Sequence, residues 1–293
     1  MIKKGHIISA QKDRYQVVLE ENGRMLYCTG KGAFRDKHLS PMVGDFVDVE
    51  IGQEDGVIVK LYPRKNQLLR PPVANVDQVL LVQTIVEPDM NVLSLDRILI
   101  VMEKRKLPIL LCFNKMDRVE SDRLDMWKRL YESLGYKIFA VNSLTGQGLD
   151  SLRKEMQGKI TAIAGPSGAG KSTLIRYLSK NDQVVIGDLS KKISRGKQTT
   201  RTVTLFTLDK DSYIFDTPGF SSLDLRDIDD IQDLQEAFPE IRKYKHLCKF
   251  RDCSHRKEPD CQVRKALEEG LIAKSRYNSY LTFFNEIQER KKY

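Results

Sequence analysis

No apolar run in this chain approaches the ~20 residues that a helix needs to cross a bilayer. The longest runs cover only residues 79–82, 98–102 and 109–113. The N-terminus is basic, but the apolar segment of a secretory signal does not follow it. We therefore expect a cytoplasmic protein without a membrane partner.

Cysteine is also scarce, with five residues in a chain of 293. An odd number of cysteines in a reducing compartment argues against a disulfide framework and leaves metal binding or ordinary burial as their roles. Internal repeats and low-complexity stretches are absent as well. A chain of this length with 41% hydrophobic residues can fold as two or three packed domains.

Positive charge is in excess, with a formal net charge of +9 that is spread along the chain. Two segments are densely basic: residues 191–201 carry five basic residues and no acidic one, and residues 242–265 carry nine against three. Such a segment is either a solvated face of the protein or a surface that binds nucleic acid.

The first region, residues 1–68, has the alternating apolar and polar residues that are typical of short strands. These strands are expected at residues 15–19, 25–28, 43–49 and 56–59. The spacing favours a small β-barrel such as an OB-fold, which binds oligonucleotides and would serve here as an RNA-binding domain. The segment Arg70-Pro71-Pro72 breaks regular structure and marks the end of this domain.

The second region, residues 69–228, alternates short apolar runs with amphipathic stretches. The apolar runs predict parallel strands buried on both faces, at residues 79–82, 109–113, 138–141 and 160–164. Three- and four-residue spacing of apolar side chains predicts helices over residues 93–103, 123–134 and 149–156. We predict a doubly wound α/β domain here, followed in residues 229–293 by a helical domain around a Cys/His cluster.

The segment from Gly165 to Ser172 fits the phosphate-loop pattern G-x-x-x-x-G-K-[ST], between an expected strand and an expected helix. Glycines let backbone N–H groups face phosphate oxygens at a helix N-terminus. Lys171 is expected to neutralise the β- and γ-phosphates, and Ser172 to bind Mg²⁺. The sequence thus predicts a nucleoside triphosphate site that uses Mg²⁺.

Two further motifs concern the same nucleotide. Asp216-Thr-Pro-Gly219 has the form D-x-x-G, in which the carboxylate reaches Mg²⁺ through water and the Gly219 amide meets the γ-phosphate. Asn114-Lys-Met-Asp117 follows an expected strand, and its Asp117 carboxylate can accept two hydrogen bonds that guanine offers and adenine does not. This N-K-x-D motif selects GTP over ATP.

The order of these motifs is unusual, because Asn114 precedes Gly165 whereas small GTPases generally carry the phosphate loop first. The domain is therefore expected to be circularly permuted, which costs little when domain termini lie close together. Residues 141–146 then supply the second guanine-binding turn, with Asn142 and Ser143 as its binding residues.

The C-terminal region holds Cys248, Cys253, His255 and Cys261 within 14 residues. A Cys3His set leaves no open position, so it predicts one structural zinc ion that orders its loop, with ordinary buried thiols as the alternative. Basic residues between the ligands favour phosphate binding, so RNA is the expected partner. The apolar residues that follow fit one packed helix better than a base-stacking surface: Leu267, Leu271, Tyr277, Leu281 and Phe284.

Together these motifs resemble the ribosome small subunit-dependent GTPase A family, the circularly permuted GTPases of bacterial ribosome assembly, over nearly the whole chain. The resemblance implies an OB-fold, a permuted GTPase domain and a C-terminal zinc domain. It implies that guanine contacts Asn114, Lys115, Asp117 and the backbone of Ser143, and that Thr199 and Thr200 lie in the first switch. The phosphates would be bound by Gly165, Pro166, Ser167, Gly168, Ala169, Gly170, Lys171, Ser172 and Thr173.

One position departs from the family. Members commonly have a histidine before the paired threonines, where this chain has Gln198. A glutamine can orient the attacking water but cannot accept its proton, which suffices where catalysis depends mainly on positioning and charge stabilisation. A plain surface glutamine is the alternative.

Two functions are compatible with this resemblance. The first is a GTP hydrolase that binds the small ribosomal subunit and its rRNA late in maturation, acts as a monomer and leaves after hydrolysis. The second is an rRNA-binding module whose affinity is set by GTP or GDP and whose own turnover is small.

Overall fold

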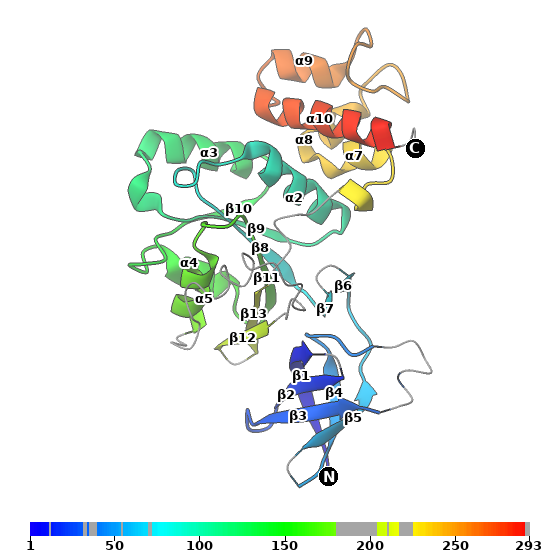
Figure 1. Cartoon of the computed structure of the whole chain (residues 1–293). Helices are drawn as coiled ribbons and strands as arrows, with labels where there is room; N and C mark the ends of the chain where they lie inside the picture. The colour runs from blue at the N-terminus through cyan, green and yellow to red at the C-terminus, as the bar shows by residue number, and fades with distance from the viewer. Residues whose placement is uncertain are drawn as a thin grey trace.

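The computed structural model describes residues 1–11, 13–31, 34, 40–53, 55–69, 72–179, 204–209, 211–216 and 225–290. Figure 1 shows three parts along the chain: an N-terminal barrel in blue, a central sheet flanked by helices, and a helical C-terminal part in yellow to red.

In the described part of the N-terminal region, five strands form the barrel: β1 (Ile2–Gln11), β2 (Arg14–Leu19), β3 (Met25–Gly30), β4 (Phe46–Ile51) and β5 (Gly56–Leu61). They pair in the order β1-β2-β3-β5-β4, and β4 pairs back on β1, so the barrel closes. Its core contains fully buried side chains from alternate positions, among them Val17, Val47 and Ile58. The predicted OB-like barrel is therefore confirmed.

Two details of the barrel differ from expectation. β1 is a further strand, and the strand expected at residues 43–49 begins only at Phe46. Gly44 has a φ of +94°, a left-handed conformation that ends the extended backbone, and Val43 forms only an isolated bridge with Val73. A two-stranded hairpin of β6 (Gln67–Leu69) and β7 (Pro72–Ala74) then leads to the central sheet.

Among the described residues, the central sheet has six strands in the order β10-β9-β8-β11-β13-β12. Their bounds are β8 (Gln78–Gln83), β9 (Ile109–Phe113), β10 (Lys137–Ala140), β11 (Ile160–Ala164), β12 (Thr204–Asp209) and β13 (Ser212–Asp216). All neighbours are parallel except β12 and β13, which pair antiparallel. β12, a strand not expected from the sequence, also pairs with β1 at Thr204 and Ser9, so the sheet continues into the barrel.

Helices cover both faces of this sheet, as predicted for a doubly wound domain (Figure 1). Leu81 and Leu111 point to the face that packs against α2 (Val92–Lys104) and α3 (Ser121–Ser133). Leu80 and Leu110, one position away on the same strands, point to the face of α4 (Leu149–Glu155) and α5 (Lys171–Ser179). A short 3-10 turn, η1 (Met116–Arg118), follows β9.

The C-terminal part begins with the 3-10 turn η3 (Leu225–Asp227) and contains α7 (Ile231–Ala237), α8 (Pro239–Lys245), α9 (Gln262–Glu268) and α10 (Lys274–Arg290). Tyr277 and Phe284 are buried in α10, as expected for a packed face. The expectation of one helix is wrong at Leu271, which lies between α9 and α10 and is 59% exposed. Across the described ranges, we find no helix whose length and hydropathy would let it cross a membrane.

A buried ion network holds the C-terminal helices against α2. The Arg276 guanidinium of α10 is fully buried, and it pairs with Asp96 of α2 at 2.5 Å and with Glu240 of α8 at 2.6 Å. Burial raises the pKa of Asp96, and the two carboxylates raise the pKa of Arg276 against the effect of its burial. At the edge of the interface, Arg97 donates two hydrogen bonds to Glu286, at 2.8 and 2.7 Å.

Candidate nucleotide and metal sites

The predicted nucleotide motifs meet at one edge of the sheet. Asn114 directly follows β9, Asn142 lies two positions after the end of β10, and Gly165 directly follows β11, so all three loops leave the carboxyl ends of parallel strands. Asp216 ends the neighbouring strand β13, where it is in register with Ile163 of β11. Ligands of open α/β sheets bind at this edge.

The phosphate loop requires glycine at its two ends. A Cβ atom at Gly165 would lie 2.0 Å from the Val82 carbonyl oxygen, and a Cβ atom at Gly170 would lie 2.3 Å from the Asn114 side-chain nitrogen. Both glycines have positive φ, at +138° and +88°. Only glycine permits this backbone path between β8 and the N-K-x-D loop, and the path leads directly into α5.

Lys171 is the first residue of α5. Its Nζ donates to the carbonyl oxygens of Gly165 at 2.8 Å and Pro166 at 2.7 Å, which places the ammonium against the loop. Ser172 and Thr173 follow in the first turn of the helix. A cation and a helix N-terminus thus meet at one point, the arrangement that binds a polyphosphate.

Asn114 connects three loops. Its side-chain nitrogen donates to the Ala169 carbonyl of the phosphate loop at 2.8 Å and to the Ser143 hydroxyl at 3.0 Å. Its side-chain oxygen accepts the Ser143 backbone N–H at 3.0 Å. Asn114 is 1% exposed, so these bonds are shielded from water. One buried amide therefore fixes the N-K-x-D loop, the phosphate loop and the second guanine turn relative to one another.

Asp117 and Asn142 form a second contact between the base loops. The Asn142 amide nitrogen donates to the Asp117 carboxylate at 2.8 Å, while its oxygen accepts the N–H groups of Leu144 and Thr145. The asparagine thus shapes its own turn and orients the carboxylate expected to recognise guanine. Asp117 remains able to accept further hydrogen bonds, since an ionised carboxylate has about four lone-pair sites.

Four residues of the predicted site lie outside the described part of the chain: Gln198, Thr199, Thr200 and Gly219. The loop between β8 and α2, residues 84–91, was not anticipated as part of the site, although it lies beside these motifs. In the sequence this segment lies between an expected strand and an expected helix, and it contains no nucleotide motif.

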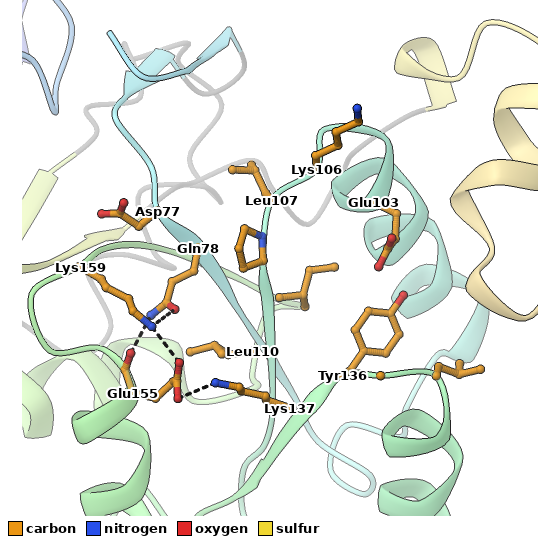
Figure 2. Close-up of a pocket in the computed structure, with 14 residues that line it drawn as sticks. Asp77, Gln78, Glu103, Lys106, Leu107, Leu110, Tyr136, Lys137, Glu155 and Lys159 are labelled. Carbon is orange, nitrogen blue, oxygen red and sulfur yellow. Dashed lines mark hydrogen bonds and ion pairs between the residues drawn. The ribbon is translucent and has the colours of Figure 1, made fainter. Parts of the chain in front are cut away.

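A cavity of about 650 Å³ opens at the opposite edge of the sheet, beside the amino ends of β8, β9 and β10 (Figure 2). Lys159 donates to Glu155 at 2.8 Å and to Gln78 at 3.2 Å, and Lys137 donates to the same Glu155 at 2.9 Å. The lysines lower the pKa of Glu155 through these hydrogen bonds. Lys137 and Lys159 are thus already paired with Glu155 in this cavity, and none of the residues that line it belongs to the nucleotide motifs.

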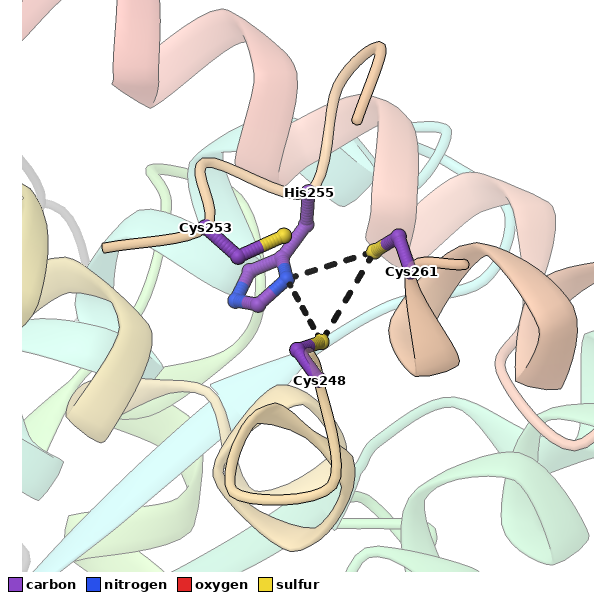
Figure 3. Close-up of side chains that lie close together, drawn as sticks. All are labelled: Cys248, Cys253, His255 and Cys261. Atoms are coloured by element: carbon purple, nitrogen blue, oxygen red, sulfur yellow. Dashed lines mark hydrogen bonds between the residues drawn. The ribbon is translucent and has the colours of Figure 1, made fainter. Parts of the chain in front are cut away.

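The four predicted zinc ligands come together in the C-terminal part (Figure 3). Their donor atoms all lie within 4.8 Å of one another. Cys261 Sγ is 3.4 Å and Cys248 Sγ is 3.6 Å from His255 Nδ1, and the two sulfurs are 4.0 Å apart. A tetrahedron with metal–sulfur bonds of about 2.3 Å has edges of about 3.8 Å. The set therefore fits one closed Cys3His zinc site.

The ligand loop is held by hydrogen bonds from its surroundings. The Glu258 carboxylate accepts the Ser254 hydroxyl and the backbone N–H groups of Ser254, Arg256 and Lys257. Hydrogen bonds, the one from the Ser254 hydroxyl foremost, lower the pKa of Glu258 to about 2 against the effect of burial. Tyr277 donates to the His255 carbonyl at 2.6 Å. Such contacts orient the ligands before a metal binds.

Burial also sets the protonation of the ligands. It lowers the pKa of His255 to about 4 and raises the pKa of Cys253 to about 12. The imidazole is therefore neutral at pH 7, as a metal requires, whereas a thiol must lose its proton when zinc binds.

Comparison with known proteins gives two family matches. The RsgA GTPase family model matches residues 61–226, and the RsgA N-terminal domain model matches residues 4–58. The protein called small ribosomal subunit biogenesis GTPase RsgA in Agathobacter rectalis is 38% identical over 301 residues, covering 99% of each chain. Its namesake in Clostridium botulinum is 40% identical over 289 residues, again covering 99% of each.

Two solved structures are similar over almost the whole length. One is YloQ, described as a circularly permuted GTPase, with 32% identity, a TM-score of 0.79, and coverage of 99% of this chain and 96% of that one. The other is YjeQ from Thermotoga maritima, with 35% identity, a TM-score of 0.81, and coverage of 98% and 99%.

Proposed function

This chain belongs to the RsgA GTPase family and is a GTP hydrolase, and we propose that it acts on the small ribosomal subunit during late maturation. In this proposal the protein binds the subunit and its rRNA in the GTP state and leaves after hydrolysis. It does so in the cytoplasm, as a monomer and without a membrane partner. The names of its relatives support the ribosomal partner.

One observation carries the proposal for the site: the buried Asn114 side chain bonds both the phosphate loop and the second guanine turn. We propose that Asn114, Lys115, Asp117, Asn142 and Ser143 bind guanine. In the same proposal, residues 165–173 bind the triphosphate, Asp216 reaches Mg²⁺ through water, and the Gly219 amide meets the γ-phosphate. Gln198, Thr199 and Thr200 are proposed to complete the catalytic site around the γ-phosphate.

The chemistry needs little beyond positioning and charge. Mg²⁺, which this family binds with GTP, neutralises phosphate charge when bound. The Lys171 ammonium, held against the phosphate loop, stabilises the negative charge that develops on the β–γ bridge as the γ-phosphoryl group leaves. Gln198 is proposed to orient the attacking water. The zinc ion has no part in the hydrolysis, because its four protein ligands leave no open position.

The domain division is proposed at residues 1–68, 69–228 and 229–293. The β6–β7 hairpin joins the barrel to the central sheet, and η3 leads into the C-terminal helices. Basic residues between the proposed zinc ligands, among them Lys249, Arg251 and Arg256, would lie on a loop that the bound metal fixes, and they favour rRNA binding.

The test is binding to purified small ribosomal subunits in sedimentation assays. With a non-hydrolysable GTP analogue, we expect the protein to sediment with the subunits, and with GDP to remain in the supernatant. Equal binding in both nucleotide states would contradict release on hydrolysis, and no binding in either state would leave a GTPase whose partner is not the subunit. The alternative, an rRNA-binding module with small turnover, predicts nucleotide-dependent binding without subunit-stimulated hydrolysis.

A further inference from the structure

The loop between β8 and α2, residues 84–91, is here called the bridging loop. β8 lies between β9 and β11 in the sheet, and these two strands lead into the N-K-x-D loop and the phosphate loop. The bridging loop therefore leaves the sheet between the two nucleotide loops. The backbone of β8 already touches both, since Gln83 O accepts the Asn114 N–H at 2.8 Å and Val82 O approaches Gly165.

The bridging loop contacts the N-K-x-D loop at Glu87. The Lys115 ammonium donates to the Glu87 carbonyl oxygen at 2.6 Å, and the Glu87 carboxylate pairs with Arg118. The Glu87–Arg118 pair is half exposed, so it contributes little by itself. The hydrogen bond from the Lys115 ammonium to the Glu87 carbonyl restricts the side chain of Lys115, which is proposed to bind guanine.

On its other side the bridging loop lies beside the phosphate loop. Pro88 Cδ lies 3.4 Å from the position that a Cβ atom would take at Gly168, so the proline ring borders this glycine. The Pro88 carbonyl oxygen accepts a hydrogen bond of 2.8 Å from the Thr84 hydroxyl. Thr84 is 1% exposed, so this bond anchors the segment Glu87–Pro88 from inside the protein.

We propose that Thr84 is a positioning residue for guanine nucleotide binding, acting by fixing the Glu87 carbonyl that holds Lys115. This inference rests on the proposed nucleotide site. A lysine side chain loses rotamer entropy when it is fixed. A carbonyl that holds it before the nucleotide arrives reduces the cost of binding, and the effect is a slower release of nucleotide.

The experiment measures dissociation of a fluorescent GDP analogue by stopped flow from the full-length protein. Thr84→Val removes the hydroxyl and keeps the shape, and we expect dissociation to be roughly fivefold faster, as for one buried hydrogen bond. Thr84→Ser keeps the hydroxyl and should restore the parent rate. Thr161→Val is the matched control, because Thr161 is equally buried and bonds Gln78 at the far edge of the sheet.

A double-mutant cycle tests the route through Lys115. In a Lys115→Met background, Thr84→Val should change the dissociation rate by less than twofold, because the side chain that it positions is absent. An undiminished effect in that background overturns the inference, as does a normal rate in Thr84→Val or an equal change in Thr161→Val. If Thr84→Val does not melt cooperatively, Thr84→Ala replaces it. A parent protein that binds no GDP would instead refute the proposed nucleotide site.

Discussion

Replacing Arg276 with methionine removes the cation that joins α10 to α2 and α8. The Arg276 side chain is fully buried, and so is the carboxylate of Asp96, while Glu240 is 4% exposed at its side chain. Methionine keeps most of the volume of the arginine stem and loses the guanidinium group, whose carbon lies 4.7 Å from the centroid of the Phe238 ring. The substitution therefore changes the charge of the network much more than its packing.

We expect Arg276→Met to lower the free energy of unfolding by about 3–5 kcal/mol, because two buried carboxylates are left without their cation. Arg97→Met is the matched control on the same interface. It breaks the ion pair between Arg97 and Glu286, whose side chains are 23% and 43% exposed respectively. We expect this control to lower the free energy of unfolding by about 1 kcal/mol or less.

The loss should also depend on pH. Burial already raises the pKa of Asp96, and removing Arg276 raises it further above its unfolded value. A carboxyl group with a raised folded-state pKa stabilises the fold below its unfolded pKa, and this contribution is lost as the pH rises through the folded pKa. The variant should therefore be least impaired at acidic pH.

The change in the free energy of unfolding is measured by urea unfolding at pH 5 and pH 8. Hydrogen exchange of α7–α10 and zinc analysis show where the variant loses structure and whether it keeps its metal. We expect α10 to lose protection while the zinc content stays near one per chain. If Arg276→Met lowers the free energy of unfolding by less than about 1 kcal/mol at pH 8, the buried network does not stabilise the fold as expected. A loss at pH 5 that equals the loss at pH 8 would contradict the expected pH dependence.

Three further predictions concern the nucleotide and metal sites. Asp117→Asn should weaken GTP and strengthen xanthosine triphosphate in competition binding, because an amide matches the xanthine edge; an unchanged preference would remove Asp117 from the base site. Lys171→Ala should lower GTP hydrolysis at least 100-fold in a phosphate-release assay, through the lost phosphate charge, and near-normal turnover would refute the phosphate-loop assignment. Cys253→Ala should abolish zinc binding and unfold the ligand loop while GDP binding stays within a few-fold of the parent; retained stoichiometric zinc would argue against the Cys3His set.

The motifs and the main strands could be predicted from sequence because their signals are local. A strand buried on both faces, such as Ile109–Phe113, has a continuous apolar run, and the phosphate loop has a fixed spacing. The ligand spacing of the zinc loop likewise predicted a set that the structure brings within 4.8 Å.

The missed features depend on contacts between distant segments. β1 has five consecutive buried residues, Gly5 to Ser9, because it pairs with β2, β4 and β12, and this pairing removes the alternation that identifies a half-exposed strand. The bridging loop became recognisable only from the strand order, which places β8 between the strands that carry the two nucleotide loops. The buried pair of Arg276 and Asp96 joins residues 180 positions apart, and no local pattern predicts it.

We propose that the small ribosomal subunit activates GTP hydrolysis by this chain. The measurement that tests it most directly is steady-state GTP hydrolysis by the full-length protein, with and without purified small subunits and with large subunits as the control. We expect slow hydrolysis by the protein alone, at least tenfold stimulation by small subunits, and no stimulation by large ones. A rate that is the same under all three conditions would contradict the claim.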